Sequence, residues 1–378
     1  MQQKRLIKCT LVGCIAALGL VAMLIGLQSN ARAFMDQHIA LLGPVPSSSF
    51  LFRFDPANGT FYTLPLQDGS LPYDVAVTGT APTHVWVTEF GTNKIGHLVY
   101  TSTNDVAWSE YPVSSTVNSG PYHLTLDGNF VWFTERGANR VGRLDATTGD
   151  MVEFYGNGLS ANSGLADIKV APNGWIWVAG QASSRLVRLA VTSTDFAFSE
   201  YTHTLLAGPS ALAIESGFDP SSYEVWFTAP DSHRIGLLTP AYGQNGFLFP
   251  SHYPLDGAPT DIVITLSSAW WTDLARNRML RMQVVGTYDT YWEYSPVNRP
   301  AGLAVDPTAA DVLWMTLQNE PGGLARFVYT SEQQTRFDSY TLPTSGLRPT
   351  GIAVASDRGV WLGALMPWKI FLPAILKG

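Results

Sequence analysis

The residues best suited to chemistry are a histidine and a glutamate in one stretch of the chain. His123 lies two residues after Pro121, and Glu135 lies three residues after Trp132. An imidazole whose ordinary pKa is about 6.5 can remove a proton at neutral pH, and clusters of carboxylates suit Mg²⁺ or Ca²⁺. The pair therefore predicts proton transfer or metal binding. A structural hydrogen bond at His123 and a solvated or paired carboxylate at Glu135 are the alternative interpretations.

A repeat surrounds both residues, and a tryptophan marks it. The tryptophans recur every 44 to 49 residues, at Trp86, Trp132, Trp177, Trp226, Trp270, Trp314 and Trp361. A period of this length with four strands per unit indicates the blades of a β-propeller. We expect these side chains on inner strands, where they pack between neighbouring blades as core residues.

Each unit contains the same order of short alternating segments. A proline opens every unit except the third, which opens on Leu165, and an apolar strand follows. A polar turn leads to the tryptophan strand, a Gly/Asn turn leads to the third strand, and the outer strand ends in glutamate and an aromatic residue, as at Glu153-Phe154. Period-two segments bounded by Gly, Pro and Asn are typical of strands. The sequence therefore predicts an all-β fold.

The two ends of the repeat region complete each other. Residues 51–62 match the third and fourth strands of a unit, whereas residues 349–363 match only the first two. Together they would form one composite blade of C-terminal inner strands and N-terminal outer strands, which leaves no open sheet edge between the first and last blades. Six whole units and this one predict a seven-bladed β-propeller of four-stranded blades over residues 51–365.

Two positions of each unit are expected at one mouth of the central channel, because the first strand begins and the second strand ends at the same face. The second residue after the opening position is, in successive units, Asp74, His123, Asp167, Ala211, Asp261, Gly302 and Gly351. The third residue after the tryptophan is Glu89, Glu135, Gly180, Ala229, Asp273, Leu317 and Ala364. We predict a pocket for an amphipathic ligand, acidic on one side and apolar on the other. Its polar lining would include Asp167, Asp261, Asp273, Tyr122 and Tyr73.

The acids of the second position could instead be paired across hairpin turns. Lys94, Arg140 and Arg278 each follow one of these acids by five residues. Arg185 and Arg234 keep the base where the acid is missing, so the acid is not an obligatory part of the turn. An exposed pair of this kind would contribute under about 1 kcal/mol.

The N-terminal segment, residues 1–33, is predicted to be a signal peptide. Three basic residues precede an apolar run at 9–27, and Ala31-Arg32-Ala33 matches a cleavage site. An uncleaved membrane anchor and a lipoprotein signal at residues 11–14 are the alternatives. Both cysteines lie in this segment, so the exported chain would have neither a disulfide nor thiol chemistry. We expect a secreted or cell-surface protein.

Cleavage after Ala33 would remove four basic residues and no acid, and would move the net charge from −7 to −11. An acidic protein without a basic run is a poor candidate for binding nucleic acid or anionic lipid. Residues 34–50 form a predicted linker. The apolar tail at 366–378 is too short to span a bilayer, and either a sorting role or packing against the last blade explains it. We expect a monomer with no transmembrane domain after signal cleavage.

The motifs around His123 and Glu135 resemble the repeat of virginiamycin B lyase (streptogramin lyase) proteins. They are Pro-Tyr-His at 121–123, Trp-Phe-Thr-Glu at 132–135 and Gly-Ala-Asn-Arg-Val-Gly-Arg-Leu at 137–144, and the resemblance extends over about residues 51–364. It implies a seven-bladed propeller that linearises a cyclic depsipeptide by elimination across its ester. In that family a histidine takes the proton α to the ester carbonyl, and Mg²⁺ polarises the carbonyl.

The resemblance implies that His123 is the base and that Glu135 holds Mg²⁺, with Glu89 and Asp74 as further metal ligands and Ca²⁺ as the alternative ion. The family has a glutamate after the tryptophan in most blades, and this chain has it in two. Three functions therefore stay open. The protein could be a lyase for a small cyclic peptide or ester, a non-catalytic binding propeller for a peptide, glycan or protein, or a metal-dependent lactonase.

Overall fold

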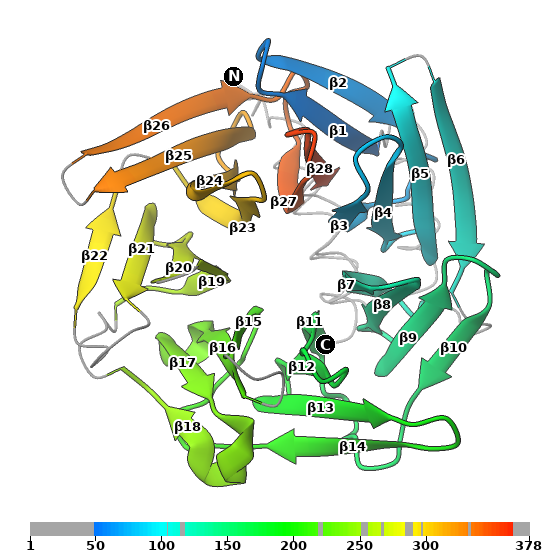
Figure 1. The fold of residues 1–378 in the computed structure, drawn as a ribbon, viewed down its shortest axis with the longest axis vertical. Helices are drawn as coiled ribbons and strands as arrows, with labels where there is room; N and C mark the ends of the chain where they lie inside the picture. Colours follow the sequence, from blue (N-terminus) through cyan, green and yellow to red (C-terminus); the bar gives the residue numbers. More distant parts are fainter. Residues whose placement is uncertain are drawn as a thin grey trace, which may run out of the picture. The chain divides into compact units, whose positions relative to one another are not determined.

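The computed structural model describes residues 49–103, 105–113, 118–217, 222–250, 256–265, 268–283, 290–295, 298–331 and 334–365. The predicted signal peptide, nearly all of the predicted linker and the C-terminal tail lie outside these residues. The described residues form seven antiparallel sheets of four strands each, arranged in a ring (Figure 1). The predicted all-β, seven-bladed propeller is therefore confirmed. None of the helices in this part of the chain is long and apolar enough to cross a membrane.

Six blades are continuous in the sequence, and each strand pairs with the next. Their strands are, in order: β3 (Pro72–Thr78), β4 (Thr83–Glu89), β5 (Lys94–Ser102), β6 (Asp105–Pro112); β7 (Pro121–Asp127), β8 (Phe130–Glu135), β9 (Arg140–Asp145), β10 (Met151–Phe154); β11 (Leu165–Val170), β12 (Ile176–Gly180), β13 (Arg185–Val191), β14 (Phe196–Tyr201); β15 (Leu212–Ser216), β16 (Tyr223–Ala229), β17 (Arg234–Leu238), β18 (Phe247–Leu248); β19 (Pro259–Thr265), β20 (Ser268–Asp273), β21 (Arg278–Gln283), β22 (Tyr291–Tyr294); β23 (Pro300–Asp306), β24 (Ala309–Leu317), β25 (Gly323–Ser331) and β26 (Gln334–Thr341). We number these blades one to six. Two short 3₁₀ turns, Pro230–Ser232 and Pro240–Gly246, flank β17.

The seventh blade is the predicted composite. Its inner strands are β27 (Arg348–Val354) and β28 (Val360–Leu365), and its outer strands are β1 (Phe50–Asp55) and β2 (Thr60–Pro65). β28 pairs antiparallel with β1, with Phe52 opposite Leu362. Figure 1 shows the red strands of the C-terminal end beside the blue strands of the N-terminal end. Strand pairing thus closes the ring.

Side chains from the two faces of each second strand fill the spaces on either side of its blade. In β8, Trp132 packs into a cluster with blade three, and Phe133 packs into a cluster with blade one. All seven marker tryptophans are at most 4% exposed, so they are core residues. Because successive side chains of a strand point to opposite faces of the sheet, every second strand contacts both neighbouring blades.

In four blades, a threonine near the end of the second strand connects the blade to the next one. The Thr134 hydroxyl accepts the N–H of His123 at 3.1 Å and donates to the carbonyl of Ala166 in blade three at 2.8 Å. Thr88, Thr272 and Thr316 make the same two contacts in their blades. At these points the innermost strand has an irregular register, as between Pro121 and Leu124. The hydroxyl satisfies backbone groups that the strand ladder leaves free.

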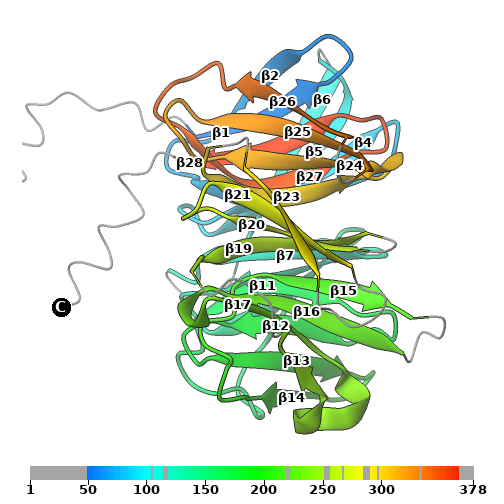
Figure 2. The same cartoon turned by 90° about the vertical axis from the view of Figure 1, so that its left-hand side faces the viewer.

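These contacts fix the residues at one face of the ring. Figure 2 shows the strands running across the ring between its two faces. Pro121, at the start of β7, lies opposite Glu135, at the end of β8. The predicted common face is therefore present, and the threonines hold its innermost residues in place.

The threonine contact can be tested at Thr272, which is fully buried. Thr272→Val keeps the shape but leaves the N–H of Asp261 and the carbonyl of Ala301 without their partner. We expect the free energy of unfolding, measured by urea denaturation, to fall by about 1–3 kcal/mol. The matched control, Thr335→Val on the exposed side of β26, should change it by less than about 0.5 kcal/mol. Equal losses in both variants would contradict this role.

Candidate functional site

The innermost strands enclose a cavity of about 460 Å³ at the centre of the ring. Every blade contributes to its wall. All seven residues of the first predicted set line it: Asp74, His123, Asp167, Ala211, Asp261, Gly302 and Gly351. Tyr73 and Tyr122 line it too. The acids and the histidine come from blades one, two, three and five, and alanine or glycine occupies the position in the other three. Three charged positions are contiguous in blades one to three, whereas Asp261 of blade five lies between the uncharged positions of blades four and six. The wall is therefore not divided cleanly into an acidic side and an apolar side.

The three aspartates also hold neighbouring blades together. Asp74 accepts the backbone N–H of Val75 in its own blade and that of Leu124 in blade two. Asp167 does the same for Ile168 and Leu212. Asp261 does the same for Ile262 and Leu303, at 2.8 and 2.7 Å. Each carboxylate therefore has a structural role before any ligand is considered.

His123 is the group best placed for proton transfer. Its Nδ1 lies 3.1 Å from Oδ2 of Asp74 and 3.8 Å from Oδ1 of Asp167. The rings of Tyr73 and Tyr122 meet the imidazole edge to face. Burial alone would lower the pKa of His123, but the carboxylate of Asp74, with that of Asp167, raises it above 6.5. No hydrogen bond to Nε2 is found among the described residues, so this nitrogen can serve a ligand in the cavity.

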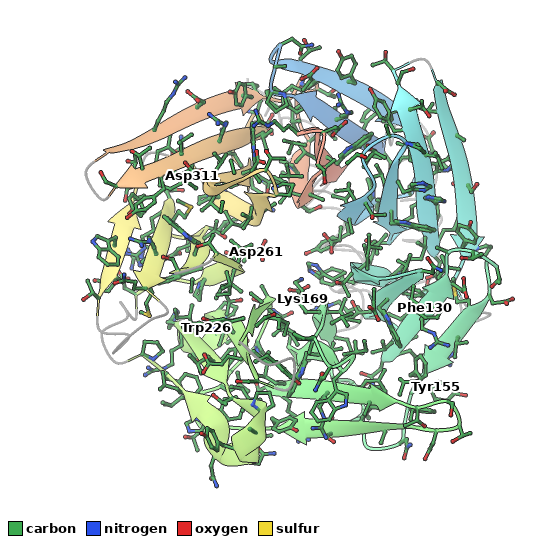
Figure 3. The ribbon with its side chains drawn as sticks, viewed as in Figure 1. Phe130, Tyr155, Lys169, Trp226, Asp261 and Asp311 are labelled. Atoms are coloured by element: carbon green, nitrogen blue, oxygen red, sulfur yellow. The ribbon has the colours of Figure 1, made fainter. Side chains whose placement is uncertain are left out.

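Lys169 is a cavity residue that the sequence motifs missed. It lies on β11 two residues after Asp167, and its Nζ donates to Asp167 Oδ1 at 2.6 Å. Figure 3 shows Lys169 and Asp261 at the inner edge of the ring. Lys169 stands out when the residue four positions after the opening position is compared across the seven units. The same position holds Ala76, Thr125, Ala213, Val263, Ala304 and Ala353 in the other blades, so the lysine is the one charge in that row.

The two tyrosines form an aromatic wall beside His123. Their rings stack with centroids 3.9 Å apart, and their hydroxyls hydrogen-bond to each other. The guanidinium of Arg136 lies 4.8 Å from the ring centre of Tyr122. Burial raises the pKa of both phenols above its ordinary value. Both therefore stay neutral at physiological pH and present ring faces and hydroxyl groups to the cavity.

The second predicted set lies elsewhere. Glu89, Glu135 and Asp273 are fully buried and do not line the cavity. The reason is alternation along the strand. Thr134 faces blade three, so the next residue, Glu135, points with Phe133 toward the interface with blade one. The second strand does end at the same face of the ring as the start of the first strand. Its last side chain nevertheless points between two blades and not into the channel.

The hairpin pairs that were the alternative interpretation of these acids are found among the described residues only at Asp273 and Arg278. Lys94, Arg140 and Arg185 pair with the glutamate that precedes the aromatic residue on the outer strand of the same blade, at Glu110, Glu153 and Glu200. Arg278 pairs with the corresponding Glu293 and also with Asp273, at 2.9 Å. The outer-strand glutamate thus gives the base a partner in each of these four blades, and it accounts for Arg185, where the hairpin acid is missing.

The mouth does not fit a Mg²⁺ or Ca²⁺ held by Glu135, Glu89 and Asp74. The two glutamates lie outside the cavity lining. Within the described residues, no three His, Cys, Asp or Glu side chains are grouped so that they could hold a metal ion. Backbone N–H groups and Lys169 already occupy the cavity carboxylates. Carboxylate oxygens at 2.0–2.6 Å from one ion are what such a site requires.

The buried position of Glu135 predicts a pH effect on stability. Burial and the nearby Glu153 raise the pKa of its carboxyl from 4.5 to about 7. The folded protein therefore holds this proton more tightly than the unfolded chain, and stability falls as pH rises from about 4.5 to about 7. Glu135→Gln cannot ionise, so it should be more stable than the wild type at pH 8, by up to about 3 kcal/mol.

Urea denaturation of both proteins at pH 4.5 and pH 8 measures this difference. Asp68→Asn, a similar change at an exposed turn residue, is the control and should not alter the pH dependence. A Glu135→Gln protein that is less stable than the wild type at pH 8 would show that the ionised carboxylate has a stabilising partner.

The comparisons with known proteins agree with this fold. No protein-family model and no curated protein sequence matches the chain. A streptogramin B lyase structure aligns with a TM-score of 0.66 at 22% identity, over 85% of this chain and 98% of that one. A catalytically inactive histidine-to-alanine variant of virginiamycin B lyase from Staphylococcus aureus, solved with quinupristin, aligns with a TM-score of 0.63 at 21% identity, over 80% and 98%.

A putative 6-phosphogluconolactonase from Bacteroides uniformis aligns less closely, with a TM-score of 0.57 at 11% identity, over 79% and 98% of the two chains. Identities this low show a shared fold only. The likeness to streptogramin lyases predicted from the repeat is confirmed at that level: this chain has the seven-bladed propeller of the streptogramin lyase structures.

Proposed function

We propose that this protein is an exported propeller enzyme that opens a small cyclic ester or depsipeptide by elimination, with His123 as the general base. The observation that carries the proposal is the placement of His123. Its Nδ1 faces Asp74 while the ring lines a cavity of about 460 Å³, a size that suits a small-molecule ligand. The predicted signal peptide supports export, and the fold shared with streptogramin lyases supports the reaction class.

Asp74 prepares the imidazole for this role. When Nδ1 donates its hydrogen to Oδ2 of Asp74, the lone pair of the neutral ring is on Nε2, which is the nitrogen left for the ligand. The raised pKa of His123 makes it a stronger base than a free imidazole. Asp74 is itself held by Val75 and Leu124, so the orientation of the ring depends on the scaffold.

The elimination then needs one proton transfer and one bond cleavage. Nε2 of His123 takes a proton from the carbon next to the one that bears the ester oxygen. The electron pair of that C–H bond becomes the new carbon–carbon double bond, the alkyl C–O bond breaks, and its electron pair leaves on the carboxylate. His123 later returns the proton to solvent. The stacked rings of Tyr73 and Tyr122 offer a surface for the apolar part of the ligand.

His123→Ala provides the first test, with quinupristin and an aromatic lactone as the probe ligands. The wild type should linearise at least one probe to an unsaturated product of unchanged mass, detected by mass spectrometry and ultraviolet absorbance. The variant should lose about 10²–10⁴-fold in rate because the base is missing, with an unchanged urea midpoint. Replacement of His203, which lies outside the cavity lining, is the control. Full activity of His123→Ala would refute its role as the base.

The pH dependence of the rate tests the pairing with Asp74. The base acts when neutral, so activity should rise with pH through a pKa above 6.5. Asp74→Asn removes the carboxylate that favours the imidazolium, so the pKa of His123 falls and the acid limb of the kcat/KM profile moves to lower pH. The maximal rate should also fall, because the ring is less well oriented. An unmoved acid limb would mean that another group titrates.

Lactone hydrolysis is the second candidate, because the same base could activate water and the putative 6-phosphogluconolactonase shares the fold. Its product gains the mass of one water and has no new double bond. Saturable binding of a probe with no product in any condition would favour a non-catalytic binding propeller.

A further inference from the structure

We infer that the ammonium group of Lys169 supplies the positive charge that polarises the ester carbonyl of the ligand, so that the reaction needs no divalent cation. This inference rests on the proposed function and adds a second catalytic residue to it. It starts from a disagreement: the resemblance implies Mg²⁺ at the mouth, whereas the mouth holds a lysine among carboxylates that are already occupied.

The first step is the spacing between Lys169 and the base. Nζ of Lys169 lies 2.6 Å from Asp167 Oδ1, and Nδ1 of His123 lies 3.8 Å from the same oxygen. The two nitrogens are therefore at most 6.4 Å apart, the sum of those distances. That bound applies to Nδ1, and the base nitrogen Nε2 lies on the other side of the same ring. Both side chains line the same cavity, so a ligand there can place a C–H group about 3 Å from Nε2 and its carbonyl oxygen about 3 Å from Nζ.

The second step is the charge of Lys169. Its side chain is 35% exposed and lines the cavity. Burial alone would lower the pKa of this amine, but Asp167, Asp74 and Asp261 raise it above 10.5. The amine is therefore protonated at neutral and mildly alkaline pH. A fixed cation in a partly desolvated site stabilises developing carboxylate charge without reorganisation at the moment of reaction.

The third step is how the ammonium is held. Asp167 is 2% exposed, and its Oδ1 accepts both the Ile168 N–H and Lys169 while its Oδ2 accepts the Leu212 N–H. The carboxylate is thus fixed by blades three and four and orients one of the three ammonium hydrogens. The other two hydrogens remain for a ligand. Asp167 acts as a positioning residue, because it reaches the ligand only through Lys169.

The experiment compares the wild type with Lys169→Met and Lys169→Arg on the same two probes, in EDTA and in added Mg²⁺. We expect wild-type turnover to be unaffected by EDTA. Lys169→Met should lower kcat about 100-fold, in the range seen when one oxyanion donor is removed, and Lys169→Arg should restore part of it. In Lys169→Met the acid limb should persist and move to higher pH, since the ammonium opposes protonation of His123.

The matched control is Lys94→Met, because Lys94 pairs with Glu110 outside the cavity lining and the same change there should leave kcat unaltered. Turnover that EDTA abolishes and Mg²⁺ restores would overturn this inference and leave the proposed function standing. Full activity of Lys169→Met in EDTA would do the same. Absence of turnover by the wild type in every metal condition would instead overturn the proposed function, and this inference with it.

Discussion

Hydrogen bonds from buried threonine hydroxyls to the neighbouring blade fix the innermost strands of four blades around the channel. Where the innermost strand leaves regular register, a backbone N–H and the carbonyl of the next blade both need a partner. Thr134 supplies both contacts between blades two and three, and Thr272 does so between blades five and six. A propeller has no covalent connection between its innermost strands, so contacts of this kind set the relative position of the blades around the channel.

The candidate site is a consequence of that irregularity. The residue whose N–H bonds to the threonine is also the one whose side chain lines the cavity, as for Asp74, His123 and Asp261. Where that residue is Asp74 or Asp261, the carboxylate adds a second contact to the following blade. Asp167 makes the same carboxylate contact in blade three, where Ala179 stands at the threonine position. The groups proposed for proton transfer and charge stabilisation thus occupy positions that the fold already holds rigid, which is what a preorganised site requires.

The acids of the second strand have a different physical setting. Glu135 is enclosed between blades one and two, and burial raises the pKa of its carboxyl to about 7. Asp273, at the same position in blade five, has Arg278 at 2.9 Å. The outer-strand glutamates take the other bases, including Arg140. The position therefore contributes to the interior between blades, and its chemistry differs from one blade to the next.

The repeat, the seven blades and the composite closure were predictable from the order of residues, because they follow from local alternation and from a period that the tryptophans display. It also identified the residues of the channel wall, since their distance from the opening proline is constant. The side of the second strand that faces the channel depends on how the blades pack, and the prediction of Glu135 at the pocket was wrong for that reason. Lys169 likewise has no motif of its own. Its proximity to His123 arises from the packing of blade three against blade two, and that packing is a contact between strands far apart in the chain.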